Sequence, residues 1–204
     1  MTRALSLAIL AMSLLIPRPH ADAATPPTGT LSCSVFAIGS SGHPSGILFK
    51  PGLTADPRTV LFKGINNGSS CDSSGVTGGK APITGVAFKL TARMDDGTCT
   101  KLTTTPTLEN ARLKFKWRGV NPAGHYMTVA TSKARIATTS YDSGTHSLIV
   151  TTEPLIGNAF LGKTVTLQLG FDSYVAELEG GCQPSGGFVG VNFGEHNAAT
   201  LDLQ

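Results

Sequence analysis

Charged residues are scarce in this chain of 204 residues, at 14%, and aromatic residues reach only 6%, with a single tryptophan. A helical protein of this size uses many more glutamates and lysines. No long window shows a hydrophobic period of 3.6 residues, which excludes a helical bundle. Disorder is excluded as well, because aliphatic residues recur at regular intervals. These absences together favour an all-β fold.

The motifs of common enzymes and metal sites are also missing. There is no G-x-S-x-G motif for a nucleophilic serine, and no C-x-x-C or H-x₃-H spacing for zinc. Beyond the N-terminal region, the histidines are scattered over separate turns and strand ends: His43, His125, His146 and His196. We therefore expect no catalytic residues, no metal site and no cofactor, although a triad assembled from distant positions stays open.

Long hydrophobic runs are limited to residues 4–16, thirteen residues that follow a basic start at Arg3. A membrane-spanning helix needs about 20 such residues. Two prolines, Pro17 and Pro19, end the run, and Ala21-Asp22-Ala23 resembles a cleavage site. We predict a secretory signal peptide over residues 1–23. A single domain over residues 24–204 then follows, without a transmembrane segment. The protein is expected to be secreted, extracellular or in the periplasm or cell envelope.

The four cysteines all follow the predicted cleavage site: Cys33, Cys71, Cys99 and Cys182. An even number in an exported chain favours two disulfides. Of three possible connectivities we prefer Cys71–Cys99 with Cys33–Cys182, because the first closes a local loop and the second ties the two ends together. The first bridge would also bring Asp72 close to Asp95 and Asp96, which leaves a calcium site as an alternative.

Alternation of apolar and polar residues predicts short strands along most of the chain. The predicted strands are residues 30–38, 59–65, 83–93, 112–118, 126–130, 133–139, 147–152, 164–171 and 188–193. Residues 39–57 and 66–82 are interpreted as loops, 95–97 and 142–144 as turns, and 173–179 as either a helical turn or a strand. This spacing predicts an antiparallel β-sandwich, immunoglobulin-like or jelly-roll-like, with 7–9 strands, long loops and two disulfides. A closed barrel is the alternative.

The clearest alternation places Arg112, Lys114, Lys116 and Arg118 on one face, and Leu113, Phe115 and Trp117 on the other. Cations on one strand face recur about every 7 Å. Lys89 and Arg93 on the preceding strand could widen this row. We interpret it as a binding surface for an anionic surface polymer.

Nucleic acid is excluded as the partner of this row. The mature net charge is about +2, the formal +3 less Arg3, Arg18 and Asp22, and no aromatic side chains alternate with the cations to stack on bases. Two simpler explanations stay open. The cations could serve solubility and protect the sheet from edge-to-edge pairing. Alternatively, the acidic segment from residue 141 onward, with seven acids and one base, could lie across the row and neutralise it.

These observations predict a secreted or cell-envelope β-sandwich that is not an enzyme and acts by surface binding or in a structural role. The alternative is a small secreted hydrolase with an active site built from loops, around residues 66–82 and His125.

Overall fold

The computed structural model describes residues 25–35, 45–66, 69–182, 187–192 and 199–204. The predicted signal peptide, residues 1–23, lies outside the described residues. Among the helices in the described ranges, none is long and apolar enough to cross a membrane.

The described residues form two antiparallel sheets, a large one of twelve strands and a small one of two. The strands are β1 (Thr28–Gly29), β2 (Leu31–Val35), β3 (Gly46–Leu53), β4 (Arg58–Asn66), β5 (Ser69–Asp72), β6 (Val76–Thr77), β7 (Gly85–Gly97), β8 (Glu109–Val120), β9 (Tyr126–Asp142), β10 (Ser147–Thr152), β11 (Ile156–Gly157), β12 (Val165–Gly170), β13 (Phe188–Asn192) and β14 (Ala199–Leu203). Three short helical pieces complete the fold: α1 (Cys99–Thr104), the 3₁₀ turn η1 (Asp172–Tyr174) and α2 (Val175–Glu179).

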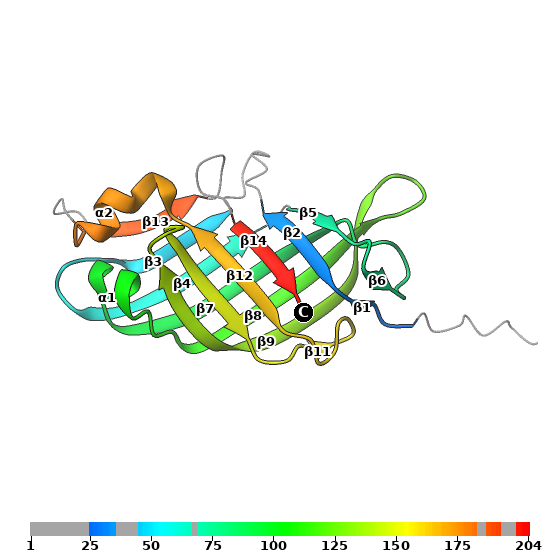
Figure 1. Cartoon of the computed structure of the whole chain (residues 1–204), viewed down its shortest axis with the longest axis horizontal. Coiled ribbons are helices and arrows are strands. Elements are labelled where there is room, and N and C mark those ends of the chain that lie inside the picture. Colours follow the sequence, from blue (N-terminus) through cyan, green and yellow to red (C-terminus); the bar gives the residue numbers. More distant parts are fainter. Residues whose placement is uncertain (1–24, 36–44, 67–68, 183–186, 193–198) are drawn as a thin grey trace, which may run out of the picture.

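The large sheet has the order β13-β3-β4-β7-β8-β9-β10-β12-β14-β2-β5, with β11 paired to β9. Strand β9 has 17 residues and changes its pairing partner along its length. Up to Arg135 this strand pairs with β8, and from Ile136 it pairs with β10. The sheet therefore curls into a half-barrel around one core (Figure 1).

The predicted sandwich of 7–9 strands is wrong, while the all-β antiparallel class and the two disulfides are confirmed. A sandwich needs two separate sheets. Here residues 126–130 and 133–139, predicted as separate strands, are parts of the continuous β9, which joins both halves of one sheet. The mean strand is about 5–6 residues long, so a strand three times that length was not expected.

Two further corrections concern loops and turns. Residues 39–57 were predicted as a loop, yet residues 46–53 of that range form β3, which pairs with both β4 and β13. Asp95, Asp96 and Gly97 were predicted as a turn, yet they end β7. Asp96 adopts φ of 53° within that strand, and the pairing with β8 and β4 shifts register nearby. The aspartates therefore bend a strand that continues, instead of reversing the chain.

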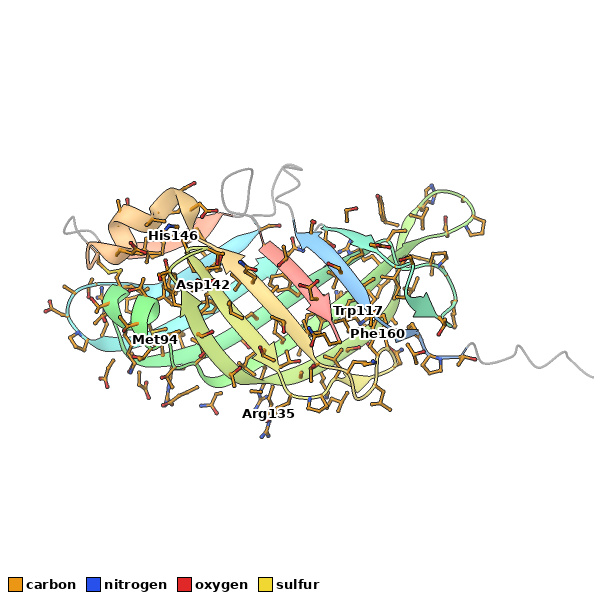
Figure 2. All side chains as sticks on the ribbon, in the orientation of Figure 1. Met94, Trp117, Arg135, Asp142, His146 and Phe160 are labelled. Carbon is orange, nitrogen blue, oxygen red and sulfur yellow. A yellow bond between two sulfur atoms is a disulfide. The ribbon has the colours of Figure 1, made fainter. Side chains whose placement is uncertain are left out.

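The core lies inside the curl and is centred on the aromatic side chains of β8. Leu113, Phe115 and Trp117 are at most 1% exposed, as their alternation predicts. Trp117 stacks on Phe115 and meets the edge of Phe160 at a ring distance of 4.8 Å. Figure 2 shows Trp117 and Phe160 close together at the end of the sheet away from the helices. The indole Nε1 donates to Ser132 Oγ at 3.0 Å, and that hydroxyl donates to the carbonyl of Ala159.

Replacing Ser132 with alanine should lower the free energy of unfolding by about 2 kcal/mol, because the buried indole N–H and the Ala159 carbonyl both lose their partner. Urea denaturation measures this loss. Ser140→Ala, at an exposed position of the same strand, is the matched control and should change stability by less than about 0.5 kcal/mol. Equal stability of the two variants would show that the buried indole N–H does not depend on Ser132.

The two helices close one end of the curl. Thr98 caps α1 by accepting a hydrogen bond from the amide of Lys101. Helices of five or six residues are only marginally stable by themselves. Here the burial of Leu102 in α1 and Leu178 in α2 stabilises them. The Cys99–Cys182 disulfide joins α1 to the residues that follow α2. Figure 1 shows both helices at the same end of the sheet, and residues 173–179 are therefore helical.

The second disulfide, Cys33–Cys71, connects directly opposed residues of β2 and β5. Our preferred connectivity is therefore wrong. It rested on closing the shorter loop, but strand pairing places Cys71 beside Cys33, a neighbour in space that is 38 residues away in sequence.

Candidate functional site

The basic row of β8 faces away from the core. Arg112, Lys114 and Lys116 are exposed, and they alternate with the buried Leu113, Phe115 and Trp117. Strand pairing supplies further cations on both sides of this row. Lys89 of β7 and Lys133 of β9 lie directly opposite Lys114. Arg112 lies opposite Arg135 of β9 and, on its other side, opposite Thr91 of β7.

We call this surface the cationic face and define it by seven exposed residues: Lys63, Lys89, Arg112, Lys114, Lys116, Lys133 and Arg135. Lys63 belongs to it through β4, where it pairs with Thr91. Neighbouring strands are about 4.8 Å apart, so these cations form a grid across four strands. In Figure 2, Arg135 points outward below β9, on the side away from Trp117 and Phe160.

None of these seven cations forms an ion pair within the described residues, where the salt bridges involve Arg93 and His146 instead. Arg93, which was expected to widen the row, contacts both Asp95 and Glu109 at 2.9 Å. The hydrogen bond to Glu109 and the charge of Asp95 raise the pKa of Arg93. Its charge is thus balanced locally, in contrast to those of the cationic face.

Arg118, the last cation of the predicted row, differs from the others. It is half-buried, and its Nε is buried without a hydrogen-bond partner in the described structure. The pairing of β8 with β9 shifts register between Trp117 and Arg118. Arg118 therefore lies at the border of the cationic face and is less accessible than Arg112, Lys114 and Lys116.

The acidic C-terminal segment does not cover the cationic face in the described part of the chain. Strands β12 and β14 lie in the other half of the sheet, with β10 and β2 as neighbours. There Asp202 accepts a hydrogen bond from Ser32 at 2.6 Å, and Glu179 contacts His146 near α2. Of the described acids in this segment, Glu153 lies beside the face. Neutralisation of the basic row by this segment, one of the alternatives left open by the sequence, is thus not found among these residues.

A hollow of about 400 Å³ lies within the cationic face. Its floor consists of β8 and β9, with Arg112 and Lys114 on one strand and Lys133 and Arg135 on the other. Along its side runs the segment after β10, which contributes Glu153, Pro154 and Ile156. The Glu153 amide donates to the Arg135 carbonyl, and Ile156 pairs with Lys133, so backbone contacts hold this wall against β9.

Sequence reasoning missed Lys63, Lys133 and Arg135. Lys133 and Arg135 alternate with buried residues that are small, the polar Ser132 and the apolar Ala134, so the hydrophobic pattern is weak. The turn at Asn121-Pro122 between β8 and β9 was the available signal, because an antiparallel hairpin places the cations of its two strands on one face.

The alternative hypothesis, a secreted hydrolase, places the active site around residues 66–82 and His125. Residues 66–82 contain β5 and β6, and Cys71 is held by its disulfide to β2. His125 is exposed in the turn between β8 and β9. Among the described residues, the histidine in contact with a carboxylate is His146, whose Nδ1 lies 3.1 Å from Glu179 Oε1.

Titratable groups surround His146, but among the described contacts no serine or threonine hydroxyl is hydrogen-bonded to its imidazole. Burial raises the pKa of Tyr141 to about 12, helped by the charges of Glu179 and Asp172. Hydrogen bonds from the Thr145 hydroxyl and the Gly144 amide lower the pKa of Asp142, which stabilises the turn. The hydroxyl of Ser147 donates to the Thr145 carbonyl. This arrangement fits a structured hairpin.

The calcium alternative loses its basis, because it required a Cys71–Cys99 bridge. Asp72 instead accepts a hydrogen bond from the Ser74 amide, and Asp95 pairs with Arg93. In the described ranges, no group of three or more His, Cys, Asp or Glu side chains is placed to hold a metal ion.

No protein family, no curated protein and no solved structure matches this chain.

Proposed function

We propose that this is a secreted or cell-envelope protein, not an enzyme, that binds an anionic surface polymer through its cationic face. The observation that carries the proposal is the register of β7, β8 and β9, which places Lys89, Lys114 and Lys133 in one line across the sheet. Like charges directly opposite each other destabilise a sheet. A surface that only had to stay soluble would intersperse both signs.

The geometry of the face also suits a polymer. Cations recur about every 7 Å along β8 and about every 4.8 Å across the strands, so a chain with repeated anionic groups can meet several of them at once. A few weak contacts then add up to useful affinity. Because the face is exposed and lies on paired strands, little reorganisation is needed on binding.

Two features support an extracytoplasmic location. Residues 1–23 have the pattern of a signal peptide, and all four cysteines are paired in disulfides. Disulfides persist in oxidising compartments and are rare in the cytosol. The polymer is therefore proposed to belong to an envelope or an extracellular matrix.

The test is retention on an immobilised polyanion, such as a sulfated polysaccharide, at low salt. Lys114→Ala combined with Lys116→Ala should elute at clearly lower salt than the wild-type chain, because two of the seven cations are lost. The matched control is Arg58→Ala with Lys80→Ala, which removes the same charge from two exposed positions that are not part of the cationic face. Elution of both double variants at the same salt, or no retention of the wild type at low salt, would reject the proposal.

A further inference from the structure

The hollow between β8, β9 and the Glu153–Ile156 wall differs from the rest of the cationic face. Elsewhere on the face the cations are lysines, whereas the hollow contains two arginines on directly opposed positions, Arg112 and Arg135. A lysine is a compact point charge, while the planar guanidinium group presents donors in a fork that matches oxyanions bidentately. Two opposed forks can share a single anion that has acceptor oxygens on more than one side.

The chemistry of such an anion is restricted by the geometry. A planar carboxylate offers two oxygens and one negative charge, which a single guanidinium fork already satisfies. A phosphate monoester carries three terminal oxygens and a charge of about −1.5 to −2 at neutral pH. It therefore matches two arginines in both charge and acceptor number, with Lys114 and Lys133 beside them.

The wall of the hollow indicates what the phosphate is attached to. Ile156 is 53% exposed, and Pro154 is exposed beside it; together they form an apolar strip at the edge of a strongly charged surface. Glu153 adds an acceptor for a hydroxyl group and repels a second anion. The apolar strip suits the ring of a sugar, and the carboxylate suits its hydroxyl groups, from which it can accept hydrogen bonds.

From these contacts we infer that the hollow is a subsite for a phosphorylated sugar unit, with Arg112 and Arg135 holding the phosphate and Glu153, Pro154 and Ile156 contacting the sugar. This inference rests on the proposed function, because the unit would be part of the polymer bound by the cationic face. The remaining lysines of the face, Lys63, Lys89 and Lys116, then add affinity for any polyanion. The hollow adds the preference for a polymer that contains phosphorylated sugars.

The experiment uses the mature chain with four small probes: glucose 6-phosphate, glucuronate, inorganic phosphate and glucose. Binding is measured by chemical-shift changes of the β8 and β9 amides during titration. Glucose 6-phosphate should bind about tenfold more tightly than glucuronate, because the carboxylate engages one guanidinium instead of two. Arg112→Lys combined with Arg135→Lys should remove this preference, because the ammonium group of lysine lacks the planar fork that holds two oxygens of one phosphate.

Two further variants complete the design. Arg58→Lys, an exposed arginine at the start of β4, is the matched control and should keep the preference for phosphate. Ile156→Ser, which removes the apolar contact without a change of charge, should bring the affinity for glucose 6-phosphate down toward that for inorganic phosphate.

Equal binding of glucose 6-phosphate and glucuronate, or a preference that survives the double Arg→Lys change, would overturn the subsite. Equal binding of glucose 6-phosphate and inorganic phosphate by the wild type would overturn its sugar-binding part. In each case polyanion retention of the wild type reports separately on the proposed function, so the two failures are distinguishable.

Discussion

Lys114→Glu should weaken binding to an immobilised polyanion and at the same time make the protein more stable. Each cation close to an anionic surface contributes about 1 kcal/mol, so reversing one charge should lower the affinity by roughly 2 kcal/mol, or about 30-fold. Stability should rise by about 1 kcal/mol, because Lys89 and Lys133 directly opposite change from repulsive to attractive neighbours of residue 114. Salt elution and urea denaturation measure the two effects.

The matched control for this prediction is Lys116→Glu. It makes the same charge change on the same strand and face, but its opposed neighbours are Ala87 and Thr131. Binding should weaken to a similar extent, whereas stability should stay within about 0.5 kcal/mol of the wild type. The stability gain of Lys114→Glu should shrink in about 1 M salt, where the screening length is about 3 Å. If both variants had wild-type stability at low salt, repulsion between the opposed lysines would not destabilise the sheet. The main support for the proposed function would then be lost.

Loss of the Cys99–Cys182 disulfide, by replacing both cysteines with serine, should lower the free energy of unfolding by about 4 kcal/mol. The bridge spans 83 residues, and the stabilisation follows chiefly from the entropy that so large a loop removes from the unfolded chain, about 4–5 kcal/mol in the chain-entropy account. The helices α1 and α2 should be affected first, since each has five or six residues and is marginal by itself. Urea denaturation without reductant measures the loss.

The control for the disulfide is the pair Cys33→Ser and Cys71→Ser. Its loop is shorter, with a separation of 38 residues, so the loss should be smaller by about 0.7 kcal/mol. Under native conditions both double variants should keep polyanion retention, because neither bridge involves a residue of the cationic face. A Cys99–Cys182 variant as stable as the wild type would show that packing of Leu102 and Leu178 alone holds the helical end.

Prediction from sequence succeeded where structure is local. In β8, the strict alternation of Arg112, Lys114 and Lys116 with Leu113, Phe115 and Trp117 identified both the core side and the exposed side, because successive side chains of a strand point in opposite directions. The same reasoning found β7, β10 and β12. It failed at β3, where prolines and glycines indicate a loop although both neighbouring strands supply hydrogen bonds.

Prediction failed where the outcome depends on distant parts of the chain. The preferred disulfide connectivity assumed that nearness in sequence decides pairing, yet Cys33 meets Cys71 because β2 and β5 are neighbours at one edge of the sheet. The short helix α1 carries too few residues for a periodic pattern. One alternative from sequence placed the C-terminal acids over the basic row, but β14 joins β12 and β2 on the other half of the curl.

The sequence by itself determined an all-β chain with two disulfides and a strand whose one face is cationic, because composition and alternation act over a few residues at a time. Only the tertiary structure decided that Lys133 and Arg135 stand opposite Lys114 and Arg112, and that the described C-terminal acids other than Glu153 lie away from them. The physical reason is that strand register and the bend within β9 are set by pairing between segments far apart in the chain, which no local pattern encodes.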